Sequence, residues 1–187
     1  KIVLFLLSIR KTFTKKIYLH DFQAKLEGQS DTESALINGN IFWNVLQNTT
    51  QNDSIILMEN ETMYFIPYSY VNSIHNVSII LEGNIILHDN ISAWNLLDED
   101  KYLSAFDIRN STNITISGNY NGVIEGKGAN WWLSFFLGKI PRQRPTIIDI
   151  SDSTDIIIEQ IQLFNGPRFH IYGDNILRFK ARYIKIW

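Results

Sequence analysis

After residue 54 the chain alternates short runs of β-branched and aromatic residues with clusters of Asn, Gly, Asp, Ser and Pro. Such runs are typical of β-strands, and the residues between them favour turns. No long helical pattern intervenes, which disfavours a doubly wound α/β fold. The pattern predicts strands at 55–57, 63–66, 77–81, 85–87, 105–108, 114–116, 123–125, 146–150, 156–158, 161–164, 169–172, 176–179 and 183–186.

A helix is predicted before these strands, over residues 31–47. The segment SDTE at 30–33 has the form of a capping box, in which the side chains of the first turn satisfy free backbone N–H groups. Apolar residues then follow at helical spacing, and we expect this stripe to pack on the core. Gly39 weakens the prediction, because an interior Gly costs about 1 kcal/mol relative to Ala. The stripe consists of Ala35, Leu36, Phe42, Val45 and Leu46.

A degenerate phrase recurs along the strand region. It reads NSIHNVSI at 72–79, NSTNITI at 110–116 and DSTDIII at 152–158, with a weaker copy, DNILRF, at 174–179. When the copies are anchored on Val77, Ile114, Ile156 and Ile176, the steps are 37, 42 and 20 residues. These steps approximate one or two turns of a unit of about 20 residues, the period of a solenoid. An antiparallel β-sandwich is the alternative, since it also uses short strands and turns.

Stacking explains why such a repeat would fold. One coil cannot bury its own inner face, so the next coil covers it, and each buried Ile or Val contributes about 1.5–3 kcal/mol. Asn at the turns tolerates a left-handed backbone and can bond to the Asn of the neighbouring coil.

Composition adds limited constraints. The 187 residues suffice for one core, and 45% hydrophobic with 19% charged residues excludes a disordered chain. The net charge of −2 selects no partner, and the absence of Cys leaves the compartment open on that criterion. Residues 139–187 carry eight basic and five acidic groups, which could face an anionic ligand or form an ordinary solvated surface.

Two features indicate a secreted glycoprotein. The start, KIVLFLLS, resembles the charged and apolar regions of a signal peptide and is too short to span a bilayer; a hydrophobic strand is the alternative. Glycosylation acceptors also exceed the roughly two expected by chance, although an AT-biased coding sequence would inflate Asn. The seven acceptors are Asn48, Asn52, Asn60, Asn76, Asn90, Asn110 and Asn113. We therefore assign residues 1–17 to the remnant of a signal peptide and leader, and 18–187 to one domain.

Three blocks in the last third of the chain carry a family resemblance. They read GNYNGVIEGKGANWW at 118–132, RPTIIDI at 144–150 and LFNGPRFH at 163–170. In this order and spacing they resemble the polygalacturonases, family 28 of the glycoside hydrolases. Near the start, DFQA at 21–24 and GQSDT at 28–32 resemble the entrance of pectin-lyase-like β-helices. Glu125 stands where the family usually has Asp, and Gly166 where it has Ser.

The resemblance implies an all-β fold, a right-handed single-stranded parallel β-helix whose open end is capped by the 31–47 helix. It also implies a secreted enzyme that hydrolyses pectin-type polysaccharide with two carboxylates by inversion. The expected partner is the polysaccharide; we expect no cofactor, metal, nucleic-acid partner or membrane span, and a monomer for the full-length protein. A non-catalytic glycan-binding or surface β-helix is the alternative.

The family's catalytic motifs are an N-T-D, a D-D pair, a G-H-G and an R-I-K, and none occurs in these 187 residues. We therefore expect the catalytic carboxylates beyond residue 187, so that the chain is an N-terminal part truncated before the catalytic coils. It follows that the chain alone should be inactive. Within the third block, Arg168 and His170 are the candidates for substrate binding. The aromatic run WWLSFFL at 131–137 is expected to pack in the core.

Overall fold

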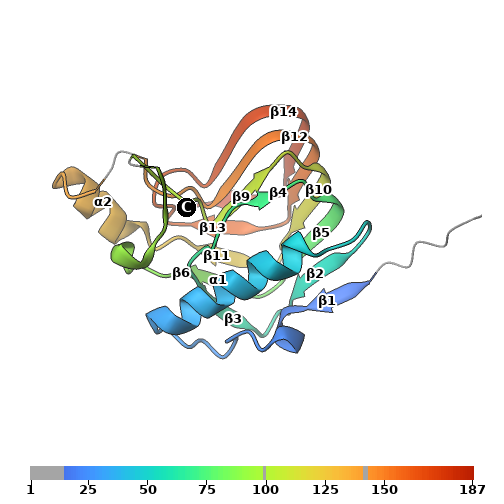
Figure 1. Ribbon diagram of the computed structural model, residues 1–187, viewed down its shortest axis with the longest axis horizontal. Helices are drawn as coiled ribbons and strands as arrows, with labels where there is room; N and C mark the ends of the chain where they lie inside the picture. The colour runs from blue at the N-terminus through green and yellow to red at the C-terminus, as the bar shows by residue number, and fades with distance from the viewer. Residues whose placement is uncertain (1–14, 99, 141–142) are drawn as a thin grey trace, which may run out of the picture.

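The computed structural model describes residues 15–98, 100–140 and 143–187; the leader-like residues 1–14 lie outside them. The described chain winds into stacked coils whose strands run parallel, which confirms the predicted parallel β-helix (Figure 1). Residues Lys16 and Ile17, assigned above to the leader, belong to the first strand of the stack. No helix in the described part of the chain is long and apolar enough to cross a membrane.

Two parallel sheets form the walls of the coils, and a small hairpin projects beside them. The first sheet contains β1 (Lys16–Tyr18), β2 (Ser54–Leu57), β4 (Val71–Asn72), β5 (His75–Leu81), β9 (Phe106–Arg109), β10 (Thr112–Ser117), β12 (Ile148–Glu159) and β14 (Ile171–Arg182). The second contains β3 (Thr62–Phe65), β6 (Asn84–Leu87), β11 (Val123–Glu125), β13 (Gln162–Phe164) and β15 (Lys185–Ile186). The hairpin is β7 (Leu96–Asp98) with β8 (Lys101–Tyr102), the one antiparallel pair among the described strands, which rules out the sandwich.

The register corrects the predicted period. Val77, Ile114 and Ile156 are direct neighbours in adjacent strands, so the steps of 37 and 42 residues are single coils lengthened by insertions, not two turns of a 20-residue unit. The partner of Ile156 in the next coil is Phe179, and Ile176 pairs with Ser153 instead. The weak fourth copy of the repeat was therefore aligned three residues too early.

Inward-facing side chains form the core in columns, one layer for each coil. Ile55, Ile79, Ile116 and Ile158 are neighbours across four strands of the first sheet, and all four are fully buried. Met63, Ile85, Ile124 and Leu163 form the facing column in the second sheet. Each coil thus supplies the apolar surface that its neighbour needs.

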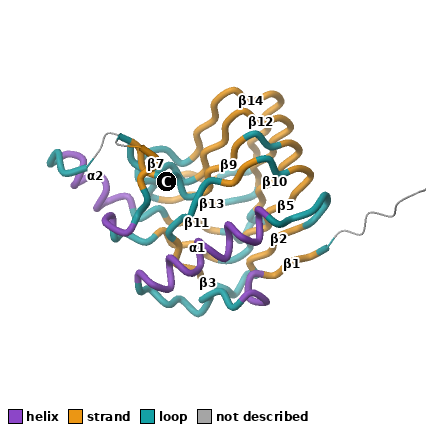
Figure 2. The backbone as a smooth tube through the Cα atoms, viewed as in Figure 1, coloured by secondary structure: helices purple, strands orange, loops and turns teal. Residues whose placement is uncertain are grey.

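Left-handed backbone positions recur at the same point of successive coils. One column of positive φ values contains Ser73, Asn110, Asp152 and Asn175, and a second contains Asn76, Asn113, Asp155 and Arg178. Side-chain hydrogen bonds join the coils at these turns: Asn113 Nδ2 donates to Asn76 Oδ1 (2.8 Å) and Asn110 Nδ2 to Asn72 Oδ1 (2.8 Å). Asn and Asp tolerate this conformation, which is why they dominate the repeated phrase. Figure 2 shows β5, β10, β12 and β14 of the first sheet stacked one above the other.

The predicted helix is α1 (Thr32–Gln47), which lies across the first coils (Figure 1). Its cap differs from the predicted box: Asp31, not Ser30, is the N-cap, and it accepts a hydrogen bond from Ser34 N (2.8 Å). This hydrogen bond is the main reason that the pKa of Asp31 lies below its usual value.

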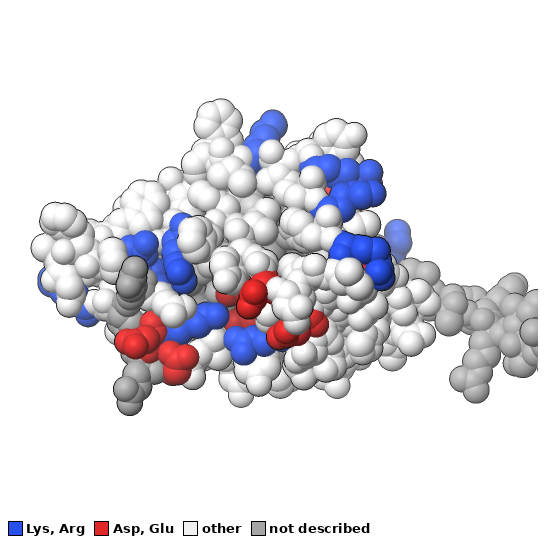
Figure 3. All heavy atoms as spheres, turned by 90° about the horizontal axis from the view of Figure 1, so that it is seen from above, with Lys and Arg blue, Asp and Glu red and all other residues white. Residues whose placement is uncertain are grey.

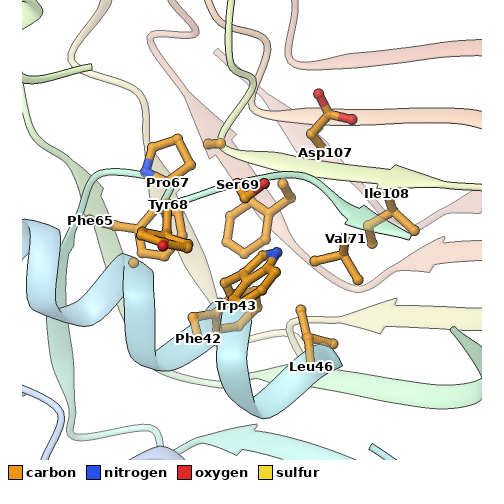
Figure 4. A pocket seen from close by; sticks show the side chains of 13 residues that line it. Phe42, Trp43, Leu46, Phe65, Pro67, Tyr68, Ser69, Val71, Asp107 and Ile108 are labelled. Carbon is orange, nitrogen blue, oxygen red and sulfur yellow. The ribbon is translucent and has the colours of Figure 1, made fainter. Parts of the chain in front are cut away.

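Aromatic side chains hold α1 on the coils, as Figure 4 shows. Phe42 packs edge-on against Phe65 (5.6 Å between ring centroids) and Phe106 (5.3 Å). The buried Asn38 adds a polar link, because its amide bonds to both backbone groups of Lys25 and to Tyr64 O. The remaining space under the helix is about 10 Å³, enough for one water and too small for a sugar.

Gly39 explains how a helix with an interior glycine is nevertheless stable here. A Cβ at this position would lie 1.7 Å from Ile66 O, so only Gly lets α1 approach the backbone of the first coil this closely. The feature that weakened the helix prediction is thus a requirement of its packing.

We predict that Gly39→Ala destabilises the protein by about 2 kcal/mol or more, although Ala is the better helix former, because the helix must move off the coil. Chemical unfolding monitored by circular dichroism measures this change. Asn40→Ala, at the neighbouring exposed position, is the matched control and should change the free energy of unfolding by less than about 0.5 kcal/mol. Equal stability of Gly39→Ala and wild type would contradict the close approach.

Candidate functional site

A polar groove of about 420 Å³ lies on the outer face of the first sheet. It is formed by β9, β12 and β14 and by the segments that precede them. Basic and acidic side chains gather side by side on the face of the molecule shown in Figure 3. The charged residues that line the groove are Lys101, Asp107, Arg109, Arg144, Asp149, Asp152, Arg168 and Asp174.

The register of the sheet places these side chains in rows. Asp107, Asp149 and Tyr172 are neighbours across three strands, and Arg109, Ser151 and Asp174 form the row two residues further on. Residues two apart in a strand face the same side, so both rows point out of the coil. Sequence analysis did not single out Asp107 or Asp149, because the strand period alone did not reveal which outward residues would share a groove.

Asp107 is committed to an ion pair. It is buried, and Arg109 donates two hydrogen bonds to it, from Nε to Oδ1 (2.7 Å) and from Nη2 to Oδ2 (2.8 Å). The bond to Asp107 is the main reason that the pKa of Arg109 is raised. The guanidinium also stacks on the ring of Tyr70, 4.2 Å from its centroid. Both carboxylate oxygens of Asp107 are therefore occupied by Arg109, which suits a structural role better than proton transfer.

Asp149 has its own partners one coil further along. Ser104 Oγ donates to Asp149 Oδ2 (2.9 Å), and Lys101 Nζ lies 3.6 Å from the same oxygen. Parallel stacking brings Asp149 beside Asp107, and like charges in this position repel. Each carboxylate has its own cation, which offsets that repulsion.

Arg168 lies in the groove, whereas His170 does not line it. Arg168 is exposed, stacks on Phe169 and makes one long hydrogen bond, from Nη1 to Gln143 Oε1 (3.5 Å). His170 Nε2 accepts a hydrogen bond from Gly166 N (3.2 Å). These positions do not test substrate binding by either residue, and both roles stay predictions.

The first and third sequence blocks meet at one junction between coils, and the second block bonds to the third through the backbone, from Ile147 N to Phe169 O (3.0 Å). Asn165 Nδ2 donates to both carboxylate oxygens of Glu125 (3.2 and 3.0 Å), so Glu125 performs a structural task where the family usually has Asp. Trp132 Nε1 donates to Gly166 O (3.1 Å). A Cβ at Gly126 would lie 2.5 Å from Asn165 O, which explains the glycine there. The blocks thus fix the position of one coil on the next.

The expectation that the aromatic run 131–137 packs in the core is wrong for most of it. The run forms α2 (Gly128–Phe136), which projects from the body of the coils (Figure 1). Trp131 alone is fully buried, against Trp94 and Tyr102. Its neighbours Trp132, Leu133, Phe135, Phe136 and Leu137 are exposed. A nine-residue amphipathic helix can bury one side only, and here that side contributes a single large residue.

The comparisons with known proteins agree with this architecture. No protein-family model matches the chain. Over 80 residues, 41% of the chain, it is 38% identical to a protein of Vitis vinifera named Probable polygalacturonase, of which that match covers 16%. The resemblance to polygalacturonases is therefore confirmed. The chain spans about a sixth of the length of this curated relative.

Two solved structures share the fold. The endo-xylogalacturonan hydrolase of Aspergillus tubingensis matches with a TM-score of 0.72 at 16% identity, over 91% of this chain and 42% of that one. The hyperthermoactive exopolygalacturonase of Thermotoga maritima matches with a TM-score of 0.69 at 15% identity, over 92% and 47%. Both agree with the parallel β-helix.

The environment of His170 generates a prediction about pH. Burial lowers the pKa of His170, and a hydrogen bond with the backbone of Trp187 opposes this only in part. The unfolded chain, in which a His has a pKa of about 6.5, then binds more protons than the folded chain below that pH, so stability falls as the pH falls. Protonation at Nε2 would also remove the acceptor for Gly166 N.

We predict that the free energy of unfolding decreases between about pH 7 and pH 5 and that His170→Gln flattens this slope. Urea unfolding at a series of pH values measures it. His75→Gln, at an exposed His outside the groove, is the matched control for the loss of an imidazole. Asp31 and Asp155, whose pKa values lie below their usual range, affect stability only in more acidic solution. A slope unchanged by His170→Gln would refute the assignment.

Proposed function

We propose that these coils form the substrate-binding part of a secreted glycoside hydrolase that cleaves pectin-type polysaccharide. The observation that carries the proposal is the polar groove on the outer sheet, in a β-helix whose sequence resembles polygalacturonases over 80 residues. An extended groove with both cations and carboxylates suits a hydroxyl-rich, acidic polymer, which offers acceptors and donors along its whole length.

We infer that the catalytic acid and base lie outside the described residues. Inversion needs two carboxyl groups about 6.5–9.5 Å apart, one protonated and one free to activate water. In the groove, Asp107 is paired with Arg109 and Asp149 with Lys101, and Asp152 accepts a hydrogen bond from Asn175. A further coil on β14 and β15 would supply the carboxylates and would cover Phe179 and Ile186, inward positions that are 43% and 54% exposed.

A non-catalytic β-helix that binds glycan is the second candidate. The same ion pairs favour it, because a groove whose carboxylates are neutralised can bind a polymer without cleaving it. The two candidates differ in whether a catalytic pair of carboxyl groups accompanies the groove, and an activity assay separates them.

We predict that the purified 187-residue chain binds polygalacturonate without releasing reducing ends. If the coding sequence that follows Trp187 encodes the N-T-D, D-D and G-H-G motifs, a chain extended through them should hydrolyse the polymer with inversion at the anomeric carbon. Reducing-end assays measure hydrolysis, and proton magnetic resonance of the first product anomer shows whether the anomeric carbon is inverted. Hydrolysis by the 187-residue chain would refute the placement of the carboxylates. An inactive extended chain with bound polymer would favour the second candidate.

Secretion belongs to the same proposal, and the structure separates the acceptors by their surroundings. Asn52 and Asn60 are exposed, and no side-chain hydrogen bond links them to another described residue. Asn76, Asn110 and Asn113 take part in the bonds between coils, Asn90 Nδ2 donates to Thr32 Oγ1, and Asn48 Nδ2 donates to Asn44 O. A glycan on the side-chain amide of Asn110 or Asn113 would replace a hydrogen bond between stacked turns.

We predict that secreted, folded protein from a eukaryotic host carries glycans at Asn52 and Asn60 and little or none at Asn110 and Asn113. Enzymatic release of glycans in heavy water, followed by peptide mass spectrometry, gives the occupancy of each site. Full glycan occupancy of Asn110 and Asn113 in folded protein would contradict their structural role. Complete absence of glycans would remove the support for secretion.

A further inference from the structure

Two arginines at one end of the groove have no carboxylate partner among the described residues. Arg144 lies in the segment just before β12, and Arg168 follows the buried Gly166 and Pro167 in the turn before β14. The groove's other two cations, Lys101 and Arg109, are paired with Asp149 and Asp107. No ion pair with a described carboxylate therefore offsets the positive charge of these two arginines.

Arg144 is held in an unfavourable position. Its Nε is buried without a hydrogen-bond partner in the described chain, and its guanidinium lies over the ring of Phe135, 4.2 Å from the centroid. Burial, and then the charge of Arg168, lower the pKa of Arg144. A desolvated cation beside a second cation costs stability unless an anion joins them.

We propose that Arg144 and Arg168 form a carboxylate-binding subsite that holds a uronate residue of the polysaccharide in the groove. The subsite rests on the proposed function, which supplies the polymer. Guanidinium groups bind carboxylates through paired, charge-assisted hydrogen bonds, and the guanidinium groups of Arg144 and Arg168 both line the groove without a carboxylate partner among the described residues. The rings of Phe135 and Phe169, over which the two arginines lie, fix their planes.

The rest of the groove gives the subsite a direction. Asp152 and Asp174 line the opposite part of the groove and would repel a uronate carboxylate. A polyuronate chain would therefore place one carboxylate at Arg144 and Arg168 and present hydroxyl groups, or an esterified uronate, to the acidic part. The subsite selects acidic over neutral polymers for this reason.

The test compares binding of polygalacturonate and of a fully methyl-esterified pectin to the 187-residue chain, by isothermal titration calorimetry at fixed ionic strength. We expect the wild type to bind the acidic polymer more tightly. Arg168→Gln and Arg144→Gln should each raise its Kd about tenfold or more while affecting the esterified polymer little. Lys180→Gln removes one positive charge outside the groove and is the matched control. Arg144→Lys keeps the charge without the fork and should restore binding only in part.

Each outcome decides the inference. A Kd for polygalacturonate that is unchanged in both variants, or that rises equally in Lys180→Gln, overturns the subsite and leaves the proposed function standing. Equal binding of acidic and esterified polymers also overturns the subsite. Absence of binding to either polymer overturns the subsite together with the pectin-type function. Should Arg144→Gln fail to fold, as judged by its circular dichroism, the exposed Arg168 still carries the test.

Discussion

Parallel hydrogen bonding between successive coils is the interaction on which the structure depends. It requires every coil to return to the same register, and the chain does so through turns in a left-handed conformation at fixed points. Asn and Asp adopt this conformation at low cost and bond to the turn of the next coil. Insertions are tolerated only between strands, which is how coils of very different length share one register.

The same stacking creates the electrostatic problem of the groove. Residues in register lie side by side, so a charge in one coil meets a residue of the next at a strand's distance. Several acids are matched with a cation in the same or the adjacent coil. Asp155 accepts two hydrogen bonds from Arg178, and Glu159 accepts one from Arg182. Among the described arginines, Arg144 and Arg168 are the two without such a partner.

Sequence analysis anticipated what depends on local patterns. Alternating apolar runs and turn residues predicted the strands, and helical spacing predicted α1 despite Gly39, whose role depends on the distant Ile66. It could not give the coil length, because the insertions between Val77 and Ile114 hide which strands are adjacent. It also missed the exposure of α2, since an aromatic run has the same sequence whether or not a partner covers it. The groove was equally hidden, because Asp107 and Asp149 come together only through register.

The residues that carry the resemblance to polygalacturonases form a packing junction between coils and no catalytic group. Glu125, Asn165 and Trp132 hold one coil on the next, and this packing constrains residue types tightly: glycines where backbones touch, an amide where a carboxylate must be bonded. Some groove residues, such as Arg168 and Asp174, are exposed, and few neighbours restrict their identity. A chain can match its relatives in the junction and still differ in the groove, so substrate preference has to be read from residues such as Arg144 and Arg168 and not from the matching blocks. Removing their charge is for this reason more informative about function than any change at the junction, which would alter the fold and the groove together.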